Sequence, residues 1–189
     1  MLDMEVVKKI YLSKTVKNFL IAVLGTLLLT ISAKIKIPFY PVPMTMQTFV
    51  VLFLGVTLGA KLGLLTVSLY LLEGIFGLPV FAGSPEKGVG LIYFTGPTMG
   101  YLIGFLFAVY CAGTFKYEKN FINSFSKLLL SVSFIYLFGL IWLGALIGWD
   151  KPVFKLGAQP FLLAELFKIL LLLFLTPIIL KTKKIIKIT

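Results

Sequence analysis

Long apolar segments alternate with short clusters of lysine, proline and glycine along the whole chain. The hydrocarbon core of a bilayer is about 30 Å thick, and about 20 helical residues cross it. Six segments are apolar enough and close enough to this length to be predicted as membrane-spanning helices. They are residues 18–33, 45–60, 62–76, 96–115, 127–148 and 161–180.

The second and third predicted helices are separated only by the turn Gly59-Ala60-Lys61. A single helix there would exceed about 30 residues and would place the charge of Lys61 in lipid, which is costly. We therefore predict two helices joined by a tight turn. The short stretch 89–94 is expected either to extend the fourth helix or to lie as a re-entrant segment.

The composition excludes a water-soluble fold. Hydrophobic residues make up 59% of the 189 residues, charged residues only 13%, and the mean hydropathy is +1.05. So few charged residues cannot form the polar faces that the helices of a soluble protein need. The chain is therefore predicted to be an all-α integral membrane protein, a compact bundle of six transmembrane helices that forms a single domain over residues 1–189 in the cell membrane.

The net charge of +11 is explained by membrane topology better than by nucleic-acid binding. All 18 basic residues are lysines, and most lie between the apolar segments. With the N terminus inside, twelve lysines fall in inner segments, Lys168 lies within the sixth helix, and five fall in outer segments. The outer five are Lys34, Lys36, Lys87, Lys151 and Lys155. This excess of inner lysines places both termini in the cytoplasm.

The outer connections differ from the inner ones in proline content. All nine prolines except Pro177 lie in or beside the outer connections, mixed with glycine and with aromatic residues such as Trp149. Proline fixes φ and glycine permits close backbone approach, so these segments are expected to be ordered loops folded over the bundle. The inner connections are short or rich in lysine. The functional site is therefore expected at the outer face.

Glu165 and Lys168 are the strongest candidate site residues. They are three residues apart on the sixth helix and share one of its faces. A charge within the membrane costs at least about 2.5–3.5 kcal/mol, so it indicates function by default. Lys168 would attract a ligand anion while Glu165 accepts hydrogen bonds from the ligand or orients the lysine. The alternative is a structural ion pair, or a lysine that reaches to the surface.

Weaker candidates lie near the outer ends of other helices. Gln47 lies near the outer end of the second helix, and Glu86 lies beside Lys87 in the longest outer connection. The alternatives are an interhelical polar residue for Gln47 and a solvated loop tip for Glu86. The chain has no histidine and shows no nucleophile–base pair, metal-ligand cluster or nucleotide-binding loop. No enzymatic activity, metal or cofactor is predicted.

Three stripes of small residues repeat every four positions. Gly55, Gly59 and Gly63 form one, and Gly96, Gly100 and Gly104 form another; both are expected to let helices of this chain pack closely. The third stripe, on the first helix, is left open between packing within the chain and docking of a partner membrane protein. It consists of Ala22, Thr26 and Thr30.

Four segments resemble one known family. They are residues 41–48 (PVPMTMQT), 71–83 (LLEGIFGLPVFAG), 96–105 (GPTMGYLIGF) and, more weakly, 160–168 (PFLLAELFK). In this order they are similar to BioY, the family of biotin-binding S components of energy-coupling factor (ECF) transporters. The resemblance covers roughly residues 18–180 and implies six helices with both termini inside and biotin held beneath the outer loops.

The resemblance also implies a function and partners. The chain would capture biotin, perform no covalent chemistry, and work with a transmembrane coupling protein and ATPase subunits of an ECF module. Lys168 would balance the biotin carboxylate, and Glu165 and Gln47 would accept the ureido N–H groups. Aromatic residues would cover the apolar rings, namely Phe39, Tyr40, Phe81, Tyr93 and Tyr101. The alternatives are a solitary or self-associating carrier and a small intramembrane enzyme acting on lipid.

Overall fold

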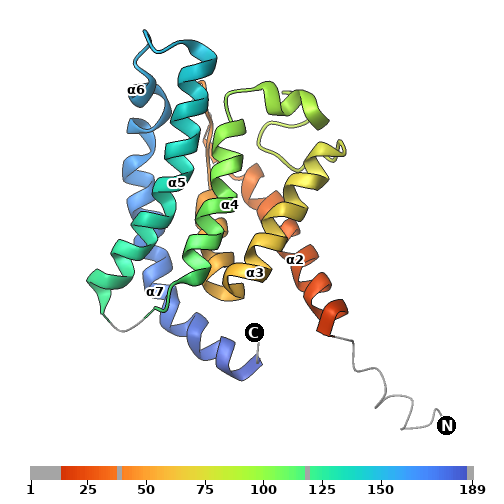
Figure 1. The fold of residues 1–189 in the computed structure, drawn as a ribbon, viewed down its shortest axis with the longest axis vertical. Coiled ribbons are helices and arrows are strands. Elements are labelled where there is room, and N and C mark those ends of the chain that lie inside the picture. The colour runs from red at the N-terminus through yellow and green to blue at the C-terminus, as the bar shows by residue number, and fades with distance from the viewer. Residues whose placement is uncertain (1–13, 38–39, 118–119, 187–189) are drawn as a thin grey trace, which may run out of the picture.

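The computed structural model describes residues 14–37, 40–117 and 120–186, and these form a bundle of α-helices with two very short strands (Figure 1). Elements are named by their labels in the figure. They are α2 (Lys14–Lys34), β1 (Lys36–Ile37), β2 (Met44–Thr45), α3 (Gln47–Ile75), η1 (Gly90–Thr95), α4 (Met99–Thr114), α5 (Phe121–Ile147), α6 (Val153–Gly157), η2 (Gln159–Phe161) and α7 (Leu162–Ile186). The strands β1 and β2 pair as an antiparallel hairpin.

The helix α3 is two antiparallel helices joined at Gly59. This residue has φ 77° and ψ 175°, a conformation that side-chain-bearing residues rarely adopt. The two halves run side by side, because the Gln47 side chain donates to the Tyr70 hydroxyl at 2.7 Å and a Cβ on Gly63 would contact the Gly55 backbone. Lys61 is exposed at the turn. The predicted separation of the second and third helices is therefore confirmed.

Six helical segments thus make up the bundle: α2, the two halves of α3, α4, α5 and α7. By length and apolar composition alone, four helical stretches qualify as membrane spans, with α3 counted as one and α4 shorter than the rest. The break at Gly59 and the inclusion of α4 raise this number to six. The first described residue, Lys14, and the last, Ile186, lie at the same end of the bundle, as Figure 1 shows.

The glycine stripes pack helices of this chain against one another, as predicted. Gly55 lies against the backbone of Val109 in α4, and Gly104 lies so close to Ile135 in α5 that a Cβ would approach its Cα to 2.6 Å. Small residues at such crossings let helix backbones approach closely. In a bilayer the hydrophobic effect does not drive helices together, so this close packing holds them instead. The helix α4 is thereby held between α3 and α5.

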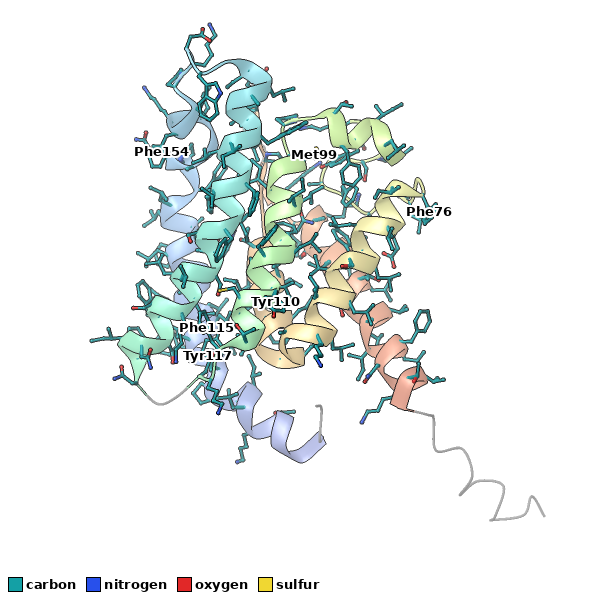
Figure 2. All side chains as sticks on the ribbon, viewed as in Figure 1. Phe76, Met99, Tyr110, Phe115, Tyr117 and Phe154 are labelled. Carbon is teal, nitrogen blue, oxygen red and sulfur yellow. The ribbon has the colours of Figure 1, made fainter. Side chains whose placement is uncertain are left out.

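The outer surface of the bundle is apolar. Phe76 is 82% exposed and Phe154 is 55% exposed, and both project from the edge of the molecule (Figure 2). Only 33% of the most apolar stretch of α5 is buried inside the protein. An apolar surface on this scale is unfavourable in water and is suited to lipid tails. The chain is a multi-pass membrane protein.

Two boundaries differ from the sequence prediction for local reasons. The helix α5 begins at Phe121 instead of residue 127, because the Asn120 side chain accepts a hydrogen bond from the Asn123 N–H at 3.1 Å and caps the helix. The stretch 89–94 forms neither a continuation of α4 nor a longer re-entrant helix but the separate 3₁₀ helix η1.

The stripe on α2 faces the inside of the chain. Ala22 is 0% exposed and Thr26 is 1% exposed, and the Thr26 hydroxyl donates to Glu73 in α3 at 2.8 Å. The Thr30 hydroxyl donates to the Thr26 carbonyl of its own helix at 2.9 Å. Ala22 and Thr26 are therefore buried while α2 packs on α3, which favours packing within the chain, and the docking of a partner on this stripe stays a prediction.

Candidate functional site

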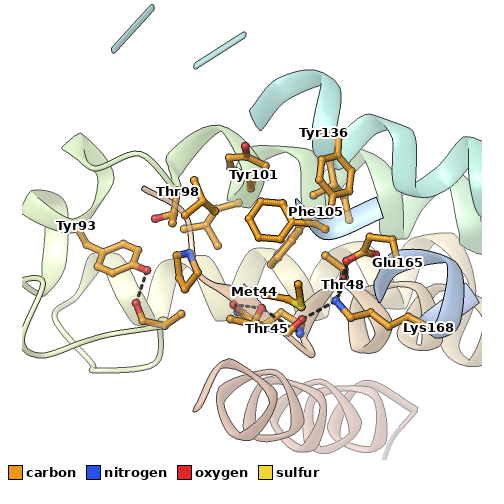
Figure 3. Close-up of a pocket in the computed structure, with 17 residues that line it drawn as sticks. Met44, Thr45, Thr48, Tyr93, Thr98, Tyr101, Phe105, Tyr136, Glu165 and Lys168 are labelled. Carbon is orange, nitrogen blue, oxygen red and sulfur yellow. Dashed lines mark hydrogen bonds and ion pairs between the residues drawn. The ribbon is translucent and has the colours of Figure 1, made fainter. Parts of the chain in front are cut away.

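A small cavity lies between the outer ends of the helices and the loops that cover them (Figure 3). Its lining comes from the β hairpin region, from the start of α3, from α4, α5 and α7, from η1 and η2, and from the loop residues Ala82 and Thr98. Its volume is about 50 Å³, below the roughly 300–1,000 Å³ of small-molecule sites. Loops or side chains must therefore move before a drug-sized ligand fits.

A buried ion pair forms one end of the cavity. The Lys168 Nζ donates to Glu165 Oε1 at 2.7 Å, to the Thr48 hydroxyl at 2.9 Å and to the Thr45 carbonyl at 2.7 Å. Glu165 is 5% exposed and Lys168 is 7% exposed. An ammonium has three N–H donors, so all of them are used. The pair thereby ties α7 to the start of α3 and to the β hairpin (Figure 3).

The second carboxylate oxygen of Glu165 lacks such partners. The Thr48 hydroxyl donates to Oε1 at 2.8 Å, whereas the buried Oε2 forms no hydrogen bond with any residue that the structure describes. The Tyr136 hydroxyl lies near enough to interact with the carboxylate without completing a bond to Oε2. A buried, unsatisfied carboxylate oxygen is costly. The cavity therefore offers a strong acceptor to a ligand N–H or O–H.

The other walls are mostly apolar and aromatic. The rings of Tyr101, Phe105 and Tyr93 line the cavity (Figure 3). The Tyr101 hydroxyl donates to the Gly157 carbonyl at 2.8 Å, and the Tyr93 hydroxyl donates to the Ala82 carbonyl at 2.7 Å. Burial raises the pKa of Tyr93, so its hydroxyl stays protonated and keeps this bond. Both rings are held in fixed positions, which suits them to pack against a flat ligand.

Five of the predicted ligand-binding residues line the cavity. They are Lys168, Glu165, Gln47, Tyr93 and Tyr101. Phe81 is buried beside the cavity and packs on Tyr70 and Tyr93, with ring centroids 5.3 Å and 4.7 Å away.

The remaining candidates lie elsewhere. Tyr40 is 92% exposed, and Glu86 is exposed; neither lines the cavity. Phe39 lies outside the described residues. The exposure of Glu86 agrees with the alternative given for it from the sequence, a solvated loop tip.

Several cavity residues were not singled out in the sequence. Thr45 and Thr48 contact Lys168 directly, and Tyr136 in α5 lies beside Glu165. Thr48 is next to Gln47 in the segment 41–48. Its position at the start of a helix, near a proline-rich loop, could have indicated a place in the site. Tyr136 lies within a long apolar stretch of α5, and nothing in the sequence shows which side of the helix faces the cavity.

Known proteins resemble this chain over most of its length. The sequence profile of the BioY family matches residues 5–185. A probable biotin transporter of Pyrococcus horikoshii is 36% identical over 152 residues, which cover 80% of this chain and 89% of that protein. A biotin transporter of Thermotoga maritima is 36% identical over 148 residues, covering 76% and 84%.

A solved structure shares the fold. The crystal structure of the S component for biotin from an ECF-type ABC transporter superposes with a TM-score of 0.75 at 26% sequence identity, covering 90% of this chain and 94% of that one. The family match covers residues 5–185, and the solved structure shares the fold of this chain. The chain belongs to the BioY family.

Proposed function

We propose that this chain captures biotin at the outer face of the cell membrane and serves as the S component of an ECF-type transporter. The observation that carries the proposal is the buried Glu165 Oε2, which accepts no hydrogen bond from the described residues and lies in a mostly apolar cavity. Biotin has two ureido N–H donors on a compact bicyclic ring. The family and its curated relatives, described as biotin transporters, support the same ligand.

The ureido group fits the end of the cavity that holds Glu165. One ureido N–H would donate to Glu165 Oε2, and the fused rings would pack against Tyr101 and Phe105. The Gln47 side chain lines the same cavity, and one of its two amide N–H groups donates to the Tyr70 hydroxyl. Its oxygen can accept from the ligand, in addition to a long 3.3 Å contact with the Thr45 hydroxyl.

For Lys168 we propose a role in positioning Glu165, while its predicted contact with the biotin carboxylate stays a prediction. All its N–H donors are used by Glu165, Thr48 and the Thr45 carbonyl, so a ligand carboxylate would have to displace one of them. Its charge still compensates Glu165 and favours an anion nearby. We assign Lys168 to orienting the Glu165 carboxylate through their 2.7 Å contact, which leaves the biotin carboxylate toward the open side of the cavity.

Transport requires partners that supply energy. The sequence offers no nucleotide-binding loop, and the structurally similar protein is a component of an ECF-type ABC transporter. We assign a transmembrane coupling protein and ATPase subunits as partners. A solitary carrier is the second possibility, and co-purification of the chain from its native membrane with or without ATPase subunits separates the two.

The test is an equilibrium binding measurement with labelled biotin on the detergent-purified chain. We expect saturable binding that unlabelled biotin competes away. Glu165→Gln should weaken affinity about tenfold or more, because a hydrogen bond to a charged group contributes roughly 1.5–3 kcal/mol. Asp150→Asn, which neutralises an exposed acid paired with Lys151 at 3.1 Å, is the matched control and should bind normally. Absence of competed binding would refute the proposal.

A further inference from the structure

The segment Pro79–Ser84 forms part of the roof of the cavity, and side chains from three other elements hold its backbone. Ala82 in this segment lines the cavity. Within the segment, the backbone N–H groups of Val80 and Ser84 make short local bonds, to the carbonyls of Leu78 and Phe81. Backbone carbonyls outside regular secondary structure must accept hydrogen bonds from neighbouring side chains or from water. We call residues 79–84 the roof segment.

The side chains of Tyr70, Tyr93 and Lys34 donate hydrogen bonds to the roof segment. The Tyr70 hydroxyl donates to the Val80 carbonyl at 2.9 Å, and the Tyr93 hydroxyl donates to the Ala82 carbonyl at 2.7 Å. Lys34, the last residue of α2, makes several further bonds to the segment. Its Nζ donates to the carbonyls of Pro79 at 2.8 Å, Phe81 at 3.1 Å and Ser84 at 2.9 Å, and contacts the Ser84 hydroxyl at 3.4 Å.

The two tyrosines and the lysine differ in their surroundings. Tyr70 and Tyr93 are buried, so breaking their bonds would leave buried polar groups unsatisfied. Lys34 is an exposed residue, its bond to the Pro79 carbonyl is exposed, and its contacts with Phe81 and Ser84 are partly buried. All the groups that it contacts are neutral, so water that reaches the exposed side of the ammonium can replace them at a smaller cost than at the two buried tyrosines. The bonds of Lys34 are therefore the ones that can break and re-form reversibly while the rest of the fold stays intact.

The cavity needs such a movement. At about 50 Å³ it is too small for a ligand of the size of biotin. We propose that Lys34 is a latch: its ammonium pins the roof segment to the end of α2, and release of this contact opens the cavity to the outside. Lys34 is thus a positioning residue that touches the roof segment and not the ligand site. The ligand part of this inference rests on the proposed function.

The chain offers a matched control for the latch. Lys36 is two residues further on, is exposed, and also belongs to the outer segment, yet it pairs through its backbone with Thr45 in the β hairpin. Lys34→Met and Lys36→Met remove the same charge from nearly the same place. Both keep the length of the side chain. Only the first removes the donors to the roof segment.

The first experiment needs no ligand. In a chain with Cys111→Ala, Ala82→Cys places a reporter thiol at the roof, and its reaction rate with a water-soluble maleimide reports opening. We expect Lys34→Met to raise this rate about tenfold and Lys36→Met to leave it unchanged. Ala108→Cys, at a fully buried position in α4, reports loosening of the whole bundle and should not respond to either substitution.

The outcomes decide between a latch and a general structural role. Equal rates for Lys34→Met and Lys36→Met would overturn the proposal. A parallel rise at Ala108→Cys would overturn it too, because Lys34 would then support the whole fold. In a chain with alanine restored at position 82, a latch predicts that Lys34→Met raises the association and dissociation rates of biotin together, with a smaller change in affinity. If wild-type chain binds no biotin, the proposed function fails while the labelling result stands.

Discussion

At the scale of single residues, the Glu165–Lys168 pair sets the character of the site. Two opposite charges three residues apart on an apolar helix are tolerable because each has a partner: the N–H donors of Lys168 are satisfied, and Oε1 of Glu165 accepts two hydrogen bonds. The remaining oxygen, Oε2, is buried and accepts no hydrogen bond from the described residues. The same residues thus tie the outer end of α7 to α3 and present the acceptor that the proposed ligand would use.

Removing one charge should be far worse than removing both. Lys168→Met leaves the Glu165 carboxylate buried without compensation, which typically costs about 3–5 kcal/mol. We expect a marked fall in the thermal unfolding midpoint in detergent, together with weaker biotin binding. The double variant Glu165→Gln and Lys168→Met should recover most of the stability and none of the affinity. Unchanged biotin affinity in Lys168→Met would remove Lys168 from the site.

The sequence could identify this pair but not its surroundings. A glutamate and a lysine are conspicuous within residues 161–180 because every neighbour is apolar. The Thr45 carbonyl, by contrast, is a backbone group 123 residues away, and only the packing of the β hairpin on α7 brings it to Lys168. Tyr40 was a reasonable aromatic candidate from its loop, yet it is 92% exposed, since loop composition does not fix which side a ring takes.

At the scale of elements, the helices were predictable because hydrophobic segments of the right length have few alternatives in a bilayer. The break at Gly59 was also predictable, from the cost of placing Lys61 in lipid. The short β hairpin and the helices η1, α6 and η2 were not. They contain too few residues to show any periodicity, and tertiary contacts decide their conformation. The early start of α5 depended on a single capping side chain, Asn120.

The packing of α4 on α5 depends on individual glycines and can be tested at one position. A Cβ on Gly100 would overlap the Phe138 carbonyl oxygen and the Trp142 side chain. Overpacking of this kind usually costs about 1–3 kcal/mol. Gly100→Ala should therefore lower the unfolding midpoint in detergent clearly. Gly96→Ala is the control from the same stripe: its Cβ would meet only the Tyr93 carbonyl oxygen, at 3.2 Å, and its backbone is extended. Similar effects of both substitutions would contradict this account of the stripe.

At the scale of the whole molecule, helix length explains where the site lies. The helix α4 has 16 residues, about 24 Å at 1.5 Å per residue, whereas α5 has 27, about 40 Å. The shorter helix in the middle leaves space at one end of the bundle. The connections on either side of η1 and the cavity occupy that end, opposite both described ends of the chain (Figure 1). A ligand can thus bind within the protein and still be reached from outside.

The topology that places this cavity outside depends on α3 crossing the membrane twice. If α3 were one span, the bundle would have five crossings, and the two ends of the chain would lie on opposite sides. Lys61 in the turn of α3 and Lys87 in the loop before η1 then distinguish the two arrangements. In a chain with Cys111→Ala, we expect Lys87→Cys to react with a membrane-impermeant thiol reagent in intact cells. Lys61→Cys should react only after the cells are opened, because its turn belongs to the cytoplasmic side. The positive-inside rule, the break at Gly59 and an outward-facing cavity all require this pair of results, and reaction of Lys61→Cys in intact cells would contradict the three together.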